Sequence, residues 1–169
     1  MIVFSIILLV ISFFLQGITS NFLAYMSGSI SIFSTIYVLI TLLLIYPYFE
    51  NKKKYLLLLV IFGWLVDLVY CNTFLLNISI FYIVYKCSNL FHFFLPENLF
   101  TINISNLLGI FIYHLLSFLT LSILNYDNYS FIVLTKTLGC SIIMTLIYTT
   151  ISYYFIRFIK TKMELKEVK

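Results

Sequence analysis

The first 49 residues of the chain contain no charged side chain, and this feature restricts the possible fold more than any other. A membrane-spanning α-helix needs about 20 apolar residues, so the stretch is long enough for two such helices. Gly28 and small polar residues cluster in the segment 21–29, which favours a break in the chain there. We therefore predict one helix over 2–23 and a second over 30–49.

The rest of the chain continues this pattern of apolar runs separated by short polar segments. Only 9% of the residues are charged, against about 25% in a soluble domain, which predicts an integral membrane protein. We expect one domain over 1–169, a loop in the membrane interface over 92–103, and a helical charged tail over 160–169. The predicted fold is all-α with six transmembrane helices, of which the other four are 55–70, 74–91, 104–124 and 131–159.

The cations are distributed unevenly over this predicted arrangement. An even number of spans places both termini on one side of the membrane, and the cytoplasmic side carries the excess of Lys and Arg. With cytoplasmic termini, nine cations fall on the inner side and only Lys136 falls in the outer half. The sequence therefore predicts a multi-pass membrane protein with both termini in the cytoplasm. The inner cations are Lys52, Lys53, Lys54, Lys86, Arg157, Lys160, Lys162, Lys166 and Lys169.

Asp67 is an acidic residue inside a predicted span, where a charged side chain costs roughly 2.5–3.5 kcal/mol on insertion scales. Gly63 lies on the same helix face, because residues i and i+4 share a face, and a glycine lets a neighbouring helix approach closely. Lys136 lies at a similar depth in the predicted helix 131–159. Two interpretations of Asp67 stay open: its carboxylate is hydrated near the outer surface, or it pairs with Lys136 directly or through a bridging water. Gly63, Asp67 and Lys136 are the candidate functional or packing residues.

The predicted spans lack the groups that an enzyme inside a membrane needs. Asp67 has no second carboxylate at comparable depth for acid–base or metal chemistry. His114 is the only histidine within a span, which favours a hydrogen-bonded packing role. Cys71, Cys87 and Cys140 do not have the spacing of a metal site or a redox motif. We therefore expect no catalytic residue, no metal, no cofactor, no enzymatic activity and no nucleic-acid partner.

The segment Gly63–Leu68, GWLVDL, resembles the Gly-x-x-x-Asp-Leu signature of the MreD family of rod-shape-determining membrane proteins. The length of the chain, the short third span, the basic inner loop and the charged C-terminal tail are also similar to that family. Specific residues resemble it over about 63–85. Family members usually have glycines just after the aspartate, and in this chain Cys71 and Leu75 stand at approximately those positions.

The resemblance implies a non-enzymatic scaffold of the bacterial cell-wall elongation machinery, located in the cytoplasmic membrane, that maintains rod shape by binding a bitopic MreC-like protein. The further partners that it implies are the actin-like MreB, the polymerase RodA and its class B penicillin-binding partner. It also implies a six-helix fold similar to the substrate-binding subunits of energy-coupling-factor vitamin transporters. Such a subunit is the alternative function, because it has a similar size and span count and would use Asp67 and the tyrosines in a ligand pocket that opens outward.

Overall fold

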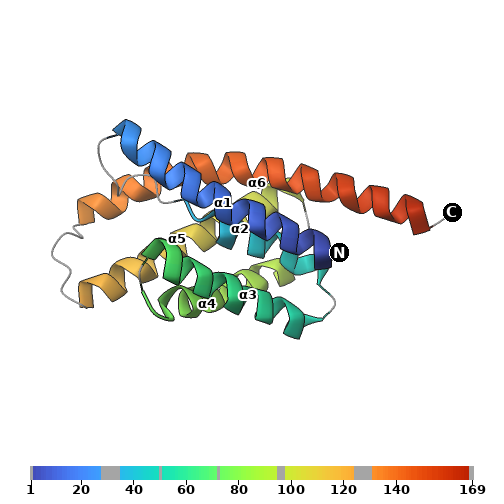
Figure 1. Cartoon of the computed structure of the whole chain (residues 1–169), viewed down its shortest axis with the longest axis horizontal. Helices are drawn as coiled ribbons and strands as arrows, with labels where there is room; N and C mark the ends of the chain where they lie inside the picture. Colours follow the sequence, from blue (N-terminus) through green and yellow to red (C-terminus); the bar gives the residue numbers. More distant parts are fainter. Residues whose placement is uncertain are drawn as a thin grey trace.

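Six α-helices and two shorter helical segments make up the part of the chain that the computed structural model describes, which is residues 2–27, 35–49, 51–71, 73–94, 98–123 and 131–167. No strand occurs in these ranges, so the prediction of an all-α protein is confirmed. A 3₁₀ turn, η1, follows the second helix, and a π-helical segment, η2, follows the third (Figure 1). The elements in chain order are α1 (Ile2–Ser27), α2 (Tyr37–Ile45), η1 (Tyr46–Tyr48), α3 (Lys52–Val66), η2 (Asp67–Cys71), α4 (Leu76–Phe94), α5 (Leu99–Ile123) and α6 (Phe131–Glu167).

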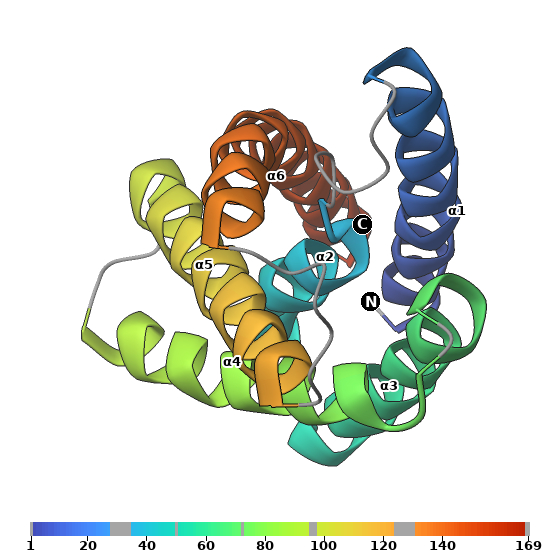
Figure 2. The ribbon, with the colours of Figure 1, turned by 90° about the vertical axis from the view of Figure 1, so that its left-hand side faces the viewer.

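The short helix α2 is the centre of the bundle, and the other five helices surround it (Figure 2). Its sequence, YVLITLLLI, has no charged residue, and all of its side chains are buried. A helix that is apolar on every side is expected in a core. The Gln16 side chain of α1 accepts a hydrogen bond from the Val38 backbone N–H at 3.4 Å, so another helix satisfies a donor at its N-terminus.

The predicted helix 30–49 is therefore wrong in its extent. Thr35 and Ile36 are not helical, the regular α-helix covers only Tyr37–Ile45, and residues 28–34 lie outside the described part of the chain. A helix of nine residues is too short to cross a bilayer, which needs about 20. Because neighbouring helices enclose α2, their side chains can satisfy its backbone away from water.

Several other boundaries differ from the prediction. α1 continues to Ser27, through most of the predicted break at 21–29. α3 begins at Lys52 rather than at residue 55, because the Asn51 side chain accepts a hydrogen bond from the Lys53 backbone N–H at 3.0 Å and caps the helix.

The predicted interfacial loop 92–103 is also mostly helical. α4 continues to Phe94 and α5 starts at Leu99, while residues 95–97 lie outside the described part. The Asn98 carbonyl accepts the Ile102 N–H at 3.0 Å, so the apolar sequence after it forms a helical turn. At the other end of the chain, α6 runs to Glu167, so the predicted helical tail is confirmed up to that residue.

Within the described residues, three helical stretches are long and apolar enough to cross a membrane: Lys52–Cys71, Leu99–Ile123 and Leu134–Lys162. Val3–Thr19 and Tyr37–Tyr48 are apolar but shorter. Large apolar side chains cover the outside of the bundle, in contrast to the polar surface of a soluble domain. These are the features of a membrane protein.

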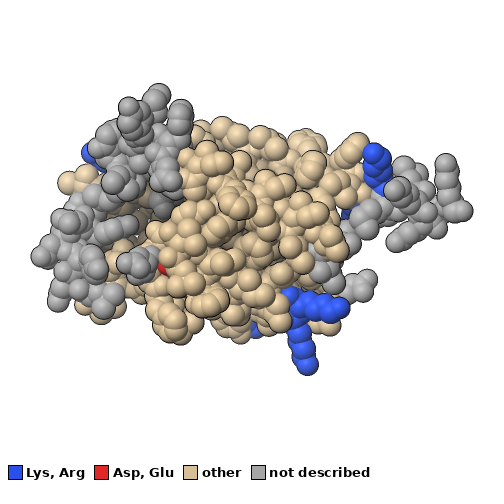
Figure 3. Space-filling model, in the orientation of Figure 1, with Lys and Arg blue, Asp and Glu red and all other residues tan. Residues whose placement is uncertain are grey.

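The described cations other than Lys136 gather at one end of the bundle (Figure 3). At this end α1 and α3 begin and α6 ends (Figure 1), and we call it the basic end. The opposite end, where η2 leads from α3 into α4, is the turn end. Lys136 lies in the first two turns of α6, which start at the turn end. The cations of the basic end are Lys52, Lys53, Lys54, Lys86, Arg157, Lys160 and Lys162, and all of them are exposed.

Candidate functional site

The connection between α3 and α4 is built around the carboxylate of Asp67, which is 0% exposed. Asp67 is the first residue of η2, and π-helical segments of this kind are rare and frequent at functional sites. One carboxylate oxygen accepts hydrogen bonds from the Thr73 hydroxyl and from the Asn77 side-chain amide, the latter at 2.9 Å. The Asn77 backbone N–H lies 3.1 Å from both carboxylate oxygens. Asp67 therefore acts as an acceptor for three donors that belong to the turn and to α4.

This arrangement makes Asp67 a cap for α4. The first N–H groups of a helix have no carbonyl partner within that helix, and the Asn77 N–H is one of them. A negative group near a helix N-terminus also interacts favourably with the helix dipole. Asp67 and Asn77 are both 0% exposed, so an N–H that lost this acceptor would stay buried and unpaired, at a cost of about 1–3 kcal/mol. The carboxylate thus stabilises the buried start of α4.

Gly63 brings α3 against α4. A Cβ atom at this position would lie 3.1 Å from Ile78 Cγ1 and 3.2 Å from Ile78 Cα. The second contact is to backbone, which cannot rotate away as a side chain can. Gly63 and Asp67 therefore act on the same neighbour, since one allows the close approach of α4 and the other caps it.

The turn between η2 and α4 contains one unusual backbone conformation. Leu75 has a φ angle of 61°, in the left-handed region that glycine adopts most easily. Its carbonyl accepts the Ser79 N–H at 3.3 Å, so this residue sets the direction in which α4 begins. Leu75 is also one of the two positions where the MreD resemblance leads us to expect a glycine.

Tyr70 of η2 connects the turn to α1. Its hydroxyl donates a hydrogen bond to the Phe13 carbonyl at 2.6 Å, and the two rings are 4.9 Å apart. A Cβ atom at Gly17 would lie 2.7 Å from the Tyr70 hydroxyl oxygen, so a larger residue there would obstruct this contact. The π-helical segment therefore holds α1 as well as α4.

Lys136 does not take part in this network. It is exposed on α6, and among the side chains that the structure describes no ion pair joins it to Asp67. The carboxylate is 0% exposed, so it does not lie at the surface, and the direct ion pair with Lys136 is not formed. The physical reason is the π-helical turn, which directs Asp67 over the N-terminus of α4, where neutral donors are in reach.

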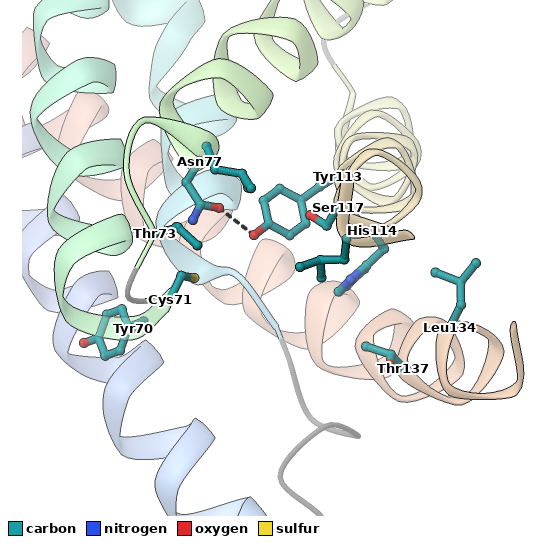
Figure 4. A pocket seen from close by; sticks show the side chains of 11 residues that line it. Tyr70, Cys71, Thr73, Asn77, Tyr113, His114, Ser117, Leu134 and Thr137 are labelled. Carbon is teal, nitrogen blue, oxygen red and sulfur yellow. Dashed lines mark hydrogen bonds between the residues drawn. The ribbon is translucent and has the colours of Figure 1, made fainter. Parts of the chain in front are cut away.

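A polar cavity of about 280 Å³ lies beside the network, between η2, α4, α5 and α6 (Figure 4). The Tyr113 hydroxyl points to Asn77 and donates a hydrogen bond to its side-chain oxygen at 2.6 Å. His114 Nε2 lies 3.2 Å from the Ser141 hydroxyl, which agrees with a hydrogen-bonded packing role for this histidine. The lining residues are Tyr70, Cys71, Thr73, Leu76, Asn77, Tyr113, His114, Ser117, Leu121, Leu134 and Thr137.

Sequence reasoning did not single out Thr73, Asn77 or Tyr113, which complete the network. Asn and Tyr are so frequent in this chain that a single one carries little information. One feature of the sequence points to Asn77 as a partner of Asp67. It lies at the start of an apolar run, ten residues after Asp67 and just past the short connection between the two helices. Tyr113 gave no such signal, because it lies on α5, 36 residues away from its partner.

The site is suited to holding polar groups in place. Asp67, Asn77 and Tyr113 form a chain of hydrogen bonds with one end at the cavity. Among the described residues, no group of three or more His, Cys, Asp or Glu side chains could hold a metal ion. No protein-family model, no curated protein and no solved structure matches the chain.

Proposed function

We propose that this protein is a non-enzymatic membrane scaffold of the bacterial cell-wall elongation machinery, similar to the MreD family, and that it maintains rod shape by binding a bitopic MreC-like protein. The observation that carries this proposal is the backbone at Leu75. The resemblance leads us to expect a glycine at about this position, and the φ angle of 61° is one that a glycine favours. The chain thus has both the signature residues Gly63 and Asp67 and, at Leu75, a backbone conformation that suits the glycine expected there.

The roles of these signature residues also support a scaffold. Asp67 is buried and accepts hydrogen bonds from Thr73 and Asn77, and Gly63 is in contact with α4. Both residues stabilise the α3–α4 hairpin and leave the outer faces of the helices apolar. In a membrane, helices associate through packing of such faces. These apolar faces suit a partner that crosses the membrane with a single apolar helix.

The proposal includes six passes through the bacterial cytoplasmic membrane, with the basic end and both termini in the cytoplasm. The second pass contains α2 and η1, which are buried among the other helices and do not span the bilayer as one regular helix. The positive-inside rule gives this orientation, since the cations of Lys52–Lys54 lie at the basic end together with Arg157, Lys160 and Lys162 of α6. In a background without cysteines, Lys53→Cys places a thiol at the basic end, and Phe74→Cys places one in the connection between η2 and α4 at the turn end. We expect an impermeant reagent to label Phe74→Cys from outside the cell and to leave Lys53→Cys unlabelled. The reverse pattern would reject the orientation.

The function is tested by co-expression with an MreC-like bitopic protein. We expect the tagged chain to retain that protein after solubilisation, and depletion of the chain in a rod-shaped host to give rounded cells. An unrelated single-span membrane protein, expressed at the same level, is the control for retention. Rods that persist after depletion, together with no retention above the control, would contradict the scaffold function.

The polar cavity favours one second candidate, a substrate-binding subunit of a vitamin transporter. It is lined by Asn77, Tyr113, His114 and Thr137 and lies at the turn end, which would face outward in the proposed orientation. Its volume of about 280 Å³ is close to the lower end of small-molecule sites, which is roughly 300 Å³. Retention of thiamine, riboflavin or a similar compound at nanomolar concentration, lost in Tyr113→Ala, would replace the scaffold function with this one.

A further inference from the structure

A second polar pocket lies at the basic end, between η1, the start of α5 and the last third of α6. Its volume is about 360 Å³, and its lining includes Tyr48, Asn98, Tyr153, Arg157 and Lys160. Arg157 and Lys160 are three residues apart on α6, so both cations lie on the same face of that helix. No acidic residue lines the pocket among the residues that the structure describes.

The pocket carries positive potential from two independent sources. The first is the pair of cations. Lys160 Nζ lies 5.5 Å from the centre of the Tyr48 ring, which keeps the ammonium group beside the pocket. The second is the N-terminus of α5, because Asn98 lines the pocket and directly precedes this helix of 25 residues. The helix dipole favours an anion near such a position.

We propose that this pocket binds the phosphate group of an anionic phospholipid, independently of the scaffold function. The pocket lies where the candidate span Leu99–Ile123 begins and the candidate span Leu134–Lys162 approaches its end, which is the depth of the lipid headgroups. Basic pockets between spans on the cytoplasmic side are typical sites for anionic headgroups.

Exposed apolar side chains beside this pocket favour a lipid over a free anion. Phe158 directly follows Arg157 on α6 and is 63% exposed, and Phe100 at the start of α5 is 75% exposed. The apolar crevice that adjoins the pocket has a volume of only about 10 Å³, so we place the acyl chains against these exposed side chains, outside the bundle. Tyrosine rings are frequent at this level of a membrane because one end is apolar and the other is polar.

The test compares phospholipid binding to the wild type, to the pocket variant Arg157→Gln/Lys160→Gln, and to the control variant Lys53→Gln/Lys54→Gln. The control removes the same charge from exposed residues at the same end. Native mass spectrometry of the full chain in detergent, with phosphatidylglycerol or phosphatidylcholine added, gives the apparent affinity. We expect a preference for phosphatidylglycerol that falls by about 30-fold in the pocket variant and by less than about threefold in the control.

Two outcomes would overturn the proposal. An equal loss in the pocket and control variants would mean that surface charge alone attracts the lipid. Displacement of phosphatidylglycerol by inorganic phosphate at equal concentration would mean that the pocket is a site for free anions. Should the double variant fail to accumulate, Arg157→Gln and Lys160→Gln are measured singly, and each is expected to lose about fivefold. Unchanged binding in both single variants would also reject the site.

Discussion

The two ends of the α3–α4 hairpin are held together by different means. At the turn end, a hydrogen-bond network joins Asp67 to Thr73 and Asn77, and Asn77 to Tyr113. We call these four residues the carboxylate network. At the basic end, the tyrosine cluster consists of Tyr46, Tyr55 and Tyr85, whose ring centres lie 5.0–5.2 Å apart.

The difference follows from what each end has to satisfy. The carboxylate network contains a charge-bearing group and a helix N-terminus that are buried together, so each donor needs a particular acceptor. In the tyrosine cluster three rings contact one another. The Tyr46 hydroxyl at its edge donates a hydrogen bond to Asn89 Oδ1 at 2.6 Å, and the buried Tyr55 hydroxyl makes only a long one of 3.3 Å to the Leu42 carbonyl. We therefore expect the turn end to depend on chemical identity and the basic end on volume and shape.

Among the changes that remove a polar group, the loss of the Asp67 carboxylate should have the largest effect. Asp67→Leu leaves the Asn77 N–H, the Asn77 amide and the Thr73 hydroxyl without their acceptor, and we expect a loss of about 3–5 kcal/mol in the free energy of unfolding. Equilibrium unfolding in mixed detergent micelles measures it. Asp67→Asn is the matched control, because it retains one acceptor oxygen and should lose less. Wild-type stability of Asp67→Leu would show that the network does not hold the turn.

At the basic end, removing a polar atom should have a smaller effect. Tyr55→Phe deletes the hydroxyl and keeps the ring between Tyr46 and Tyr85, so we expect a loss of about 1 kcal/mol or less in the free energy of unfolding. The same unfolding experiment measures this. Tyr55→Ala, which deletes the ring of a residue that is 0% exposed, should cost about 3–5 kcal/mol. Similar losses in the two variants would remove the contrast between the ends.

Replacing Leu75 in the turn by glycine should raise the free energy of unfolding. Leu75 has a φ angle of 61°, and a left-handed conformation costs a residue with a side chain about 1–2 kcal/mol. Glycine loses more chain entropy on folding, so we expect Leu75→Gly to stabilise the protein by a net value of about 0.5–1 kcal/mol. A rise in the melting temperature in detergent would register this gain. Leu75→Ala keeps the Cβ atom and should show no rise; equal behaviour of the two variants would contradict the strain.

The smallest effect should be at Lys136, which is exposed on α6. We expect Lys136→Leu to change the free energy of unfolding by less than about 0.5 kcal/mol. In a double-mutant cycle with Asp67→Leu, the two changes should add to within about 0.5 kcal/mol. If Lys136→Leu instead restored the stability lost in Asp67→Leu, the two charges would form a pair and the carboxylate network would be incomplete.

The sequence was a good guide to whatever depends on neighbours along the chain. The apolar runs predicted an all-α membrane protein. The Asn51 cap is also a local feature, but the prediction missed it and began the helix at residue 55 instead of at Lys52. The sequence was a poor guide to α2, for which it predicted 30–49 and the structure has Tyr37–Ile45. An apolar run looks the same whether lipid or protein surrounds it, so the length of a buried central helix cannot be read from hydropathy.

The sequence by itself determined that Asp67 is an exceptional residue, because a lone acid in an apolar run is costly wherever the run is folded. It also determined that Gly63 and Asp67 share one face of the helix, and that the cations are unevenly distributed along the chain. Only the tertiary structure decided how the carboxylate is satisfied. The π-helical turn, the left-handed Leu75 and the approach of α4 at Gly63 place the donors of Asn77 against it, while Tyr113 joins from α5. Which donors meet an acceptor depends on the path of the backbone in space, and distance along the chain does not encode that path.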